Sequence, residues 1–294
     1  MTTPNSAARP GGTERPEFEH MPIDASRIGD VERPLPIVER IYRSDAVQRI
    51  AIIVLLVVIW EAYARWLDYA LLFPTFIETI RVAWSDLGEL ADRVAASMRA
   101  LIVGYAVGLA IAAILTTLAV ASEIGARFLS TLTAMFNPLP AIALLPLALI
   151  WFGLGTPSLV FVIVHSVLWA VALNTLTGFR AVPETLRMSG RNLGLKGVRY
   201  VILILMPAAF PSILAGLKIG WAFAWRTLIA AELVFGASSR SGGLGWYIFA
   251  ARSELDTARV FAGLLAVIVI GLLVEAVIFR AVEARTVKLW GMQR

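Results

Sequence analysis

The stretch LIVGYAVGLAIAAILTTLAVA, residues 101–121, decides the fold because none of its side chains carries a charge. A helix rises about 1.5 Å per residue, so roughly 20 apolar residues cross a hydrocarbon layer of about 30 Å. The whole chain of 294 residues is 59% hydrophobic and only 16% charged, with a mean hydropathy of +0.77. Soluble domains carry about a quarter charged residues. The sequence therefore predicts an all-α membrane protein, because helices satisfy their own backbone polar groups in lipid.

Six segments are predicted to span the membrane. The run 128–179 lacks Asp, Glu, Lys and Arg and is too long for one span, so we divide it at GLGTPS, residues 153–158. With the N-terminus inside, 14 Lys and Arg residues lie near the cytoplasmic span ends and 7 near the outer ends. Because positive charge gathers on the cytoplasmic side, both termini of this multi-pass membrane protein are predicted to be cytoplasmic. The predicted spans are 47–67, 101–121, 128–152, 157–179, 209–234 and 260–279.

Two segments outside the spans have patterns of their own. Residues 1–46 combine prolines with scattered charges, which is typical of a disordered cytoplasmic tail, and the membrane domain is predicted to fill 47–294. Between the first two spans, apolar side chains recur every three or four positions. This spacing predicts an amphipathic helix that lies along the outer interface or packs on the bundle. Its apolar residues are Ile77, Ile80, Trp84, Leu87, Leu90 and Val94.

The residue types exclude several kinds of chemistry. The chain has no cysteine and only two histidines, so it cannot supply a thiolate metal site or a Cys–His pair. The glycine-rich stretch GRNLGLKG, residues 190–197, lacks the spacing of a phosphate-binding loop. We therefore expect no catalytic residue, no metal, no cofactor and no nucleic-acid partner.

A basic, glycine-punctuated island, MSGRNLGLKGVRYVILILMP (residues 188–207), stands between the fourth and fifth spans. Pro183 and Glu184 are typical of a helix start, and Gly194 permits a sharp turn. A second short helix is expected over 200–205, with Pro207 kinking or ending it before the fifth span. Two short helices joined at glycine predict a cytoplasmic knob. On charge alone, an ordinary positive-inside loop that binds anionic lipid is the favoured interpretation.

The spacing within this island resembles a signature of binding-protein-dependent ABC importer permeases. That signature has Glu-Ala-Ala, three residues, Gly, nine residues, Ile, one residue and Leu-Pro. Here Gly194 is followed by nine residues and then Ile204, Leu205, Met206 and Pro207, while Met188, Ser189 and Gly190 stand in place of Glu-Ala-Ala. NPLPAIALLPLALIWFGLG (137–155) and PAAFPSILAGLKIGWAFAWRTLIAAEL (207–233) resemble the nitrate, sulfonate and taurine branch of that family. The resemblance covers about 50–290 in the family's order.

The resemblance implies the six-helix bundle of a type I ABC importer permease, with loop 181–207 coupled to a separate ATPase. It implies two ATPase copies, a second permease copy that we expect to complete a homodimer, and a periplasmic or lipid-anchored substrate-binding protein, all in contact with membrane lipid. The solute would be a small, anionic molecule such as a sulfonate, taurine, nitrate or organic carboxylate. The alternative is a stand-alone secondary transporter or channel. The expected coupling residues are Arg187, Met188, Ser189, Gly190, Arg191, Gly194, Lys196 and Pro207.

Five polar residues inside the spans are candidates to line the pathway. Arg226 either contacts an anionic solute or pairs with Glu232, because ionisable residues within spans face a cavity or a partner. Asn137 lies among prolines that interrupt the third span, where freed backbone groups line a site or the chain merely kinks. His165 and Asn174 on the fourth span are either interhelical hydrogen-bond partners or ligands.

Overall fold

The computed structural model describes residues 44–120, 122–235 and 242–287, and within these ranges all regular structure is helical. Most of the predicted tail, 1–46, lies outside the described residues. The chain divides into two units, 1–55 and 56–294, and α2 crosses the boundary between them. The described helices are α2 (Asp45–Leu67), α3 (Phe76–Ser85), α4 (Leu87–Val120), α5 (Glu123–Phe136), η2 (Ala141–Leu144), α6 (Leu145–Phe152), α7 (Thr156–Ala181), α8 (Glu184–Asn192), α9 (Gly197–Tyr200), η3 (Val201–Leu205), α10 (Met206–Phe235), α11 (Leu244–Ser253), α12 (Thr257–Leu273), η5 (Val274–Phe279) and α13 (Arg280–Arg285).

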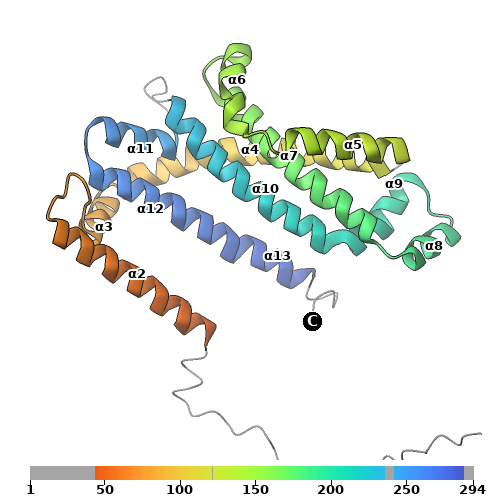
Figure 1. Ribbon diagram of the computed structural model, residues 1–294, viewed down its shortest axis with the longest axis horizontal. Coiled ribbons are helices and arrows are strands. Elements are labelled where there is room, and N and C mark those ends of the chain that lie inside the picture. The colour runs from red at the N-terminus through yellow and green to blue at the C-terminus, as the bar shows by residue number, and fades with distance from the viewer. Residues whose placement is uncertain (1–43, 121, 236–241, 288–294) are drawn as a thin grey trace, which may run out of the picture. The chain divides into compact units, whose positions relative to one another are not determined.

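All six predicted spans correspond to apolar helices. Five are long enough to cross a membrane as they stand: Ala46–Leu67, Leu87–Val120, Thr156–Ala181, Gly197–Val234 and Thr257–Arg285. The sixth is a broken pair, Glu123–Phe136 and Ala141–Phe152, with a bend of 85° between its halves. The break follows from the sequence, because Pro138 and Pro140 cannot donate backbone hydrogen bonds to the preceding turn. Figure 1 shows α6 turning away from the line of α5.

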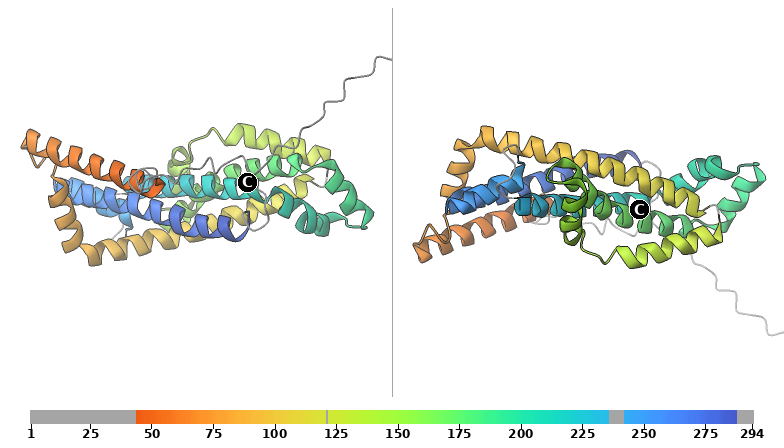
Figure 2. Two further views of the ribbon diagram at one scale, coloured as in Figure 1. Left: turned by 90° about the horizontal axis from the view of Figure 1, so that it is seen from below. Right: turned by 90° about the horizontal axis from the view of Figure 1, so that it is seen from above.

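The most deeply buried span is α7, which packs against both α4 and α10. Figure 2 shows α4 and α5 on opposite sides of α7. Small residues permit the close approach. A Cβ at Gly104 of α4 would come within 2.6 Å of Ile163, and one at Gly216 of α10 within 2.8 Å of Asn174. Within a bilayer no hydrophobic force drives helices together, and close packing at small residues stabilises their association instead.

The predicted amphipathic segment is two helices rather than one. Thr75 caps α3, accepting a hydrogen bond from the Glu78 amide, and α3 ends at Asp86, after which α4 continues into the second span. The expected apolar face packs only in part. Leu90 on α4 is buried, but Ile77 and Trp84 on α3 are 52% and 77% exposed. The α3 part of the stripe is therefore free to meet lipid or another chain.

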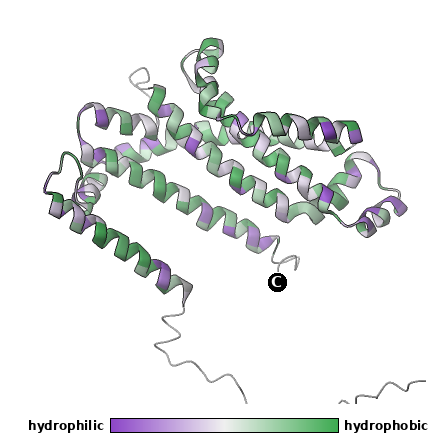
Figure 3. Cartoon of the chain, in the orientation of Figure 1, coloured by the Kyte–Doolittle hydropathy of each residue, from purple (hydrophilic) through white to green (hydrophobic). Residues whose placement is uncertain are grey.

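The expected knob is present at the end of the second unit remote from α3 and α11 (Figure 1). It consists of α8, a turn and α9, and Figure 3 shows hydrophilic residues concentrated on α8. The alternative that Pro207 ends a helix is wrong, because one apolar helix runs from Gly197 to Val234, and the alternative of a kink stays a prediction. The widened π turn Val201–Leu205 immediately precedes this proline. A π turn shifts the hydrogen-bonding register, so the helix continues past a residue that has no amide donor.

Candidate functional site

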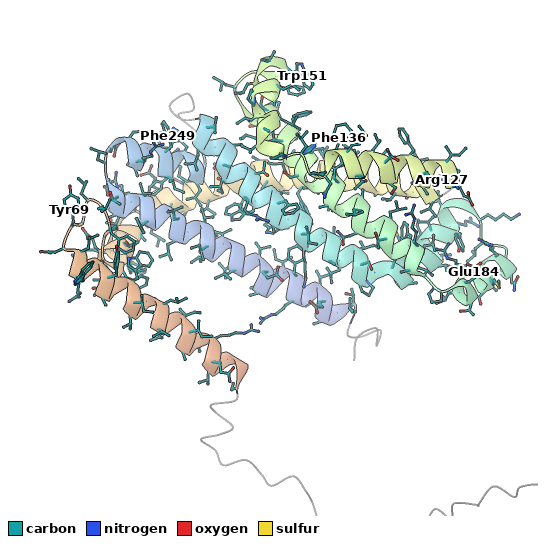
Figure 4. All side chains as sticks on the ribbon, viewed as in Figure 1. Tyr69, Arg127, Phe136, Trp151, Glu184 and Phe249 are labelled. Carbon is teal, nitrogen blue, oxygen red and sulfur yellow. The ribbon has the colours of Figure 1, made fainter. Side chains whose placement is uncertain are left out.

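A cavity of about 360 Å³ lies beside the break in the third span. Its walls come from the α5–η2 connection, α7 and α10, and they bring together three of the predicted pathway residues: Asn137, His165 and Arg226. Figure 4 marks the neighbourhood by Phe136, the last residue of α5, with Trp151 out on α6. The other two candidates, Asn174 and Glu232, do not line this cavity.

Arg226 is an exposed residue in the C-terminal half of α10. Its Nε donates to the Ala222 carbonyl at 3.1 Å, and its guanidinium carbon lies 5.1 Å from the centre of the Phe223 ring. Within the described ranges no carboxylate lies within ion-pair distance of the guanidinium. The pairing with Glu232 that the sequence left open is therefore not formed.

His165 faces the cavity from α7. Both ring nitrogens are shielded from solvent and make no hydrogen bond to any residue that the structure describes. Its ring lies edge-on to Trp169, which in turn stacks on Phe136 at 5.2 Å. A buried polar group without a partner costs about 1–3 kcal/mol, and because neither nitrogen is accessible, a ligand in the cavity would reach them only after the imidazole rotates.

Beside the cavity, a hydrogen bond between hydroxyl groups joins α7 to α10, and the sequence did not predict it. The hydroxyls of Ser166 and Thr227 are 2.8 Å apart, and Ser166 also donates to the Val162 carbonyl at 3.1 Å. Serine and threonine are too common for either to stand out in the sequence. Asn174, by contrast, donates to Ala170 within α7 at 2.8 Å and packs beside Gly216.

Glu232 holds the start of α11 in place. Its buried carboxylate accepts hydrogen bonds from the Ser97 hydroxyl of α4 and from the Gly245 amide, both at 2.8 Å. Ser97 in turn accepts from the Leu244 amide at 2.8 Å. A Cβ on Gly243 would lie 2.1 Å from the Ser97 oxygen, so only glycine fits there. In the sequence, the closely spaced glycines Gly242, Gly243 and Gly245 could have indicated a tight packing site. They could not indicate that Ser97 and Glu232 are the residues packed against them.

A second group of contacts braces the same end. Arg93 of α4 donates to the Gly242 carbonyl at 2.9 Å and lies over the Trp246 ring at 4.1 Å. The Tyr247 hydroxyl donates to Asp86 at 3.0 Å, and burial, together with that carboxylate, raises the pKa of the Tyr247 phenol. Asp86 also meets Arg259 of α12 at 3.0 Å. α3, α4, α11 and α12 are thus joined at one end.

The knob carries the predicted coupling residues. Arg187 donates to the carbonyls of Phe179 and Val182, closing the C-terminus of α7. Gly190 lets α8 lie against the next helix, because a Cβ there would come within 2.9 Å of Ile204. Gly194 adopts φ +74°, as a tight turn requires. Four other predicted coupling residues lie on or between α8 and α9 and are exposed: Met188, Ser189, Arg191 and Lys196. The last, Pro207, lies at the start of α10 and is half-buried.

Lys218 pairs with carboxylates on the sixth span. Its ammonium group on α10 forms an ion pair with Glu283 of α13 at 2.8 Å and lies 3.7 Å from Glu275 of η5. It therefore ties the fifth span to the sixth. Among the residues of the three described ranges, no group of three His, Asp or Glu side chains is placed to hold a metal ion.

The sequence of this chain is similar to a family of known proteins. The family model described as "binding-protein-dependent transport system inner membrane component" matches residues 104–288. A putative ABC transporter permease protein of Methanocaldococcus jannaschii is 31% identical over 242 residues, 80% of this chain and 90% of that protein. The taurine transport system permease protein TauC of Escherichia coli is 35% identical over 147 residues, 50% of this chain and 52% of its own length. The nitrate import permease protein NrtB of Synechocystis sp. is 30% identical over 186 residues, 63% of this chain and 66% of that protein.

Proposed function

Because this chain belongs to the family of binding-protein-dependent transport system inner membrane components, we propose that it forms the path by which an ATP-driven importer carries a small anion. The family is one of multi-pass inner-membrane permeases of the sulfonate, taurine and nitrate type, not of enzymes. The observation that carries the anionic choice is Arg226, a cation within a span that meets no carboxylate among the described residues.

Partners follow from the type of system. A binding-protein-dependent importer works with an ATPase and a substrate-binding protein. We place the ATPase contact at the α8–α9 knob, which projects from the helices and exposes Met188, Leu193 and Val198 at 54%, 75% and 60%. Exposed apolar side chains at the tip of a polar knob suit insertion into a groove on a partner. Two such chains, related by a two-fold axis, would enclose the path together with two ATPase copies.

The proposal is tested by isolating the tagged chain from its native membranes in mild detergent. An ATPase should co-purify in equimolar amount, and proteoliposomes of the complex should take up taurine or nitrate only with ATP inside and the binding protein outside. The stand-alone transporter alternative predicts no ATPase and uptake driven by an ion gradient. That result would refute the proposal.

A further inference from the structure

We infer that the cavity between the α5–η2 break, α7 and α10 is an oxyanion-binding site, with Arg226 holding the charged head and His165 and Asn137 supplying further hydrogen bonds. The inference rests on the proposed function and deepens it, because it assigns a solute site to the permease itself. A complete solute site here would let the permease contribute to selection after the binding protein has released its cargo.

The charge of the cavity favours an anion. Arg226 is the charged member of its lining as the structure describes it, and the other walls are apolar, hydroxyl, amide or imidazole groups. A cationic solute would be repelled by the guanidinium, because no carboxylate of the lining neutralises it. An anion would instead satisfy the donors of this exposed guanidinium, which meets no carboxylate among the described residues.

The guanidinium of Arg226 is oriented so that it could make a bidentate contact with an oxyanion. Nε is occupied by the Ala222 carbonyl, and the Phe223 ring lies beside the guanidinium plane. The two terminal nitrogens therefore remain for a ligand. A sulfonate, carboxylate or nitrate presents two oxygens at the spacing that such a pair of N–H groups matches.

The remaining donors lie on other elements. The imidazole of His165 lines the cavity, but both of its nitrogens are shielded and lack a partner among the described residues, so it offers an N–H to a ligand only after the side chain rotates. Asn137 adds an amide at the end of α5. The Ser166 hydroxyl is committed to the Val162 carbonyl and leaves its oxygen to Thr227, so this pair supplies no free O–H for the anion. Hydrogen-bond donors at the end of α5, on α7 and on α10 therefore line the same cavity.

The volume indicates the size of the ligand. At about 360 Å³ the cavity lies within the range of about 300–1,000 Å³ of small-molecule sites. This space, which is open on one side, exceeds what a bare four-atom oxyanion such as nitrate fills, and Ile142 and Phe223 offer apolar walls. The expected ligand is an organic sulfonate or carboxylate with a short apolar chain. Its binding must be weak, because a transported solute has to leave.

The test uses the full chain, assembled with its ATPase in nanodiscs of neutral phosphatidylcholine and without the binding protein. Trifluoromethanesulfonate serves as the probe, and broadening of its ¹⁹F resonance detects weak binding. We expect saturable broadening with this anion and none with trifluoroethanol, a neutral molecule of similar size. Arg226→Met should weaken binding about tenfold or more, because charged hydrogen bonds are lost, and His165→Phe should weaken it less.

Arg127→Met is the matched control, since Arg127 is an exposed arginine on α5 that pairs with Glu123 away from the cavity. It should leave the broadening unchanged. Equal broadening with Arg226→Met and the native chain, or with the neutral probe, would overturn the inference. So would loss of binding on adding phosphatidylglycerol, which would assign the site to a lipid headgroup. Failure of the proposed function shows separately, as absence of the ATPase from the same preparation.

Discussion

At the scale of single residues, the two charged side chains that could have formed an ion pair on α10 have different tasks. Arg226 faces a cavity, whereas the Glu232 carboxylate is buried and bonded to Ser97 and to the amide of Gly245. Six positions along one helix place two side chains on different faces. The separation of the two roles therefore follows from helix geometry, and each residue can be tested without the other.

We expect Glu232→Gln to destabilise the protein by about 1–3 kcal/mol, because the amide replaces one of two acceptor oxygens and leaves a buried donor without a partner. Arg226→Met should change stability little, and the double variant should show the sum of the two effects, since the residues share no contact. Thermal unfolding of the detergent-solubilised chain measures all three. If the second substitution rescued the first, the two residues would be an ion pair after all.

Gly243→Ala should destabilise the same end of the molecule. The new Cβ would lie 2.1 Å from the Ser97 oxygen and 2.2 Å from Glu232, so the anchor of α11 must shift. Gly88→Ala is the control, because a Cβ at that helical position meets nothing within 4 Å and alanine favours a helix by about 0.5–1 kcal/mol. A lower melting temperature is expected for the first variant only, and equal melting temperatures would contradict the steric argument.

At the scale of elements, the knob depends on one turn. Gly194 has φ +74°, and a Cβ there would touch nothing within 4 Å, so backbone strain rather than a clash penalises a substitution. Gly194→Val should therefore change the seat of α8 against its partner and uncouple ATP hydrolysis from transport, with the chain still inserted. Gly194→Asn should be milder, because asparagine tolerates this conformation better than branched residues.

The measurement for this pair is solute-stimulated ATP turnover in the reconstituted importer, with membrane insertion checked by fractionation. Normal stimulation in Gly194→Val would show that the turn does not control coupling. Loss of insertion in both variants would instead show that glycine serves folding.

The sequence was sufficient to predict the apolar spans, the break near Asn137 and the turn at Gly194, because each depends on local composition or on backbone chemistry. It was not sufficient for contacts between distant residues. Ser97 and Glu232 lie 135 positions apart, and nothing in the local pattern around either residue indicates the other. The prediction that Pro207 could end a helix was wrong because the π turn just before it lets the helix continue, a feature that a proline alone does not reveal.

At the scale of the whole molecule, the orientation in the membrane remains the prediction with the widest consequence. Because the chain has no native cysteine, single introduced cysteines can be labelled without background. Lys196→Cys, on the knob, should react with an impermeant maleimide only after the cytoplasmic face is opened. Arg252→Cys, near the end of α11, should react from outside in intact cells. Outside labelling at position 196 would invert the topology.

The glycine contacts along α7 have a mechanical consequence. With Gly104 and Gly108 pressed against Ile163 and Val167, a Cβ at either position would stand less than 3 Å from its neighbour. Sliding α4 past α7 would drive these side chains into the adjoining backbone, and Gly220 against Val171 leaves little play on the α10 side. We therefore expect the three helices to move as one rigid body. A displacement of α8 and α9 would then tilt α4, α7 and α10 together, so that their opposite ends would also move.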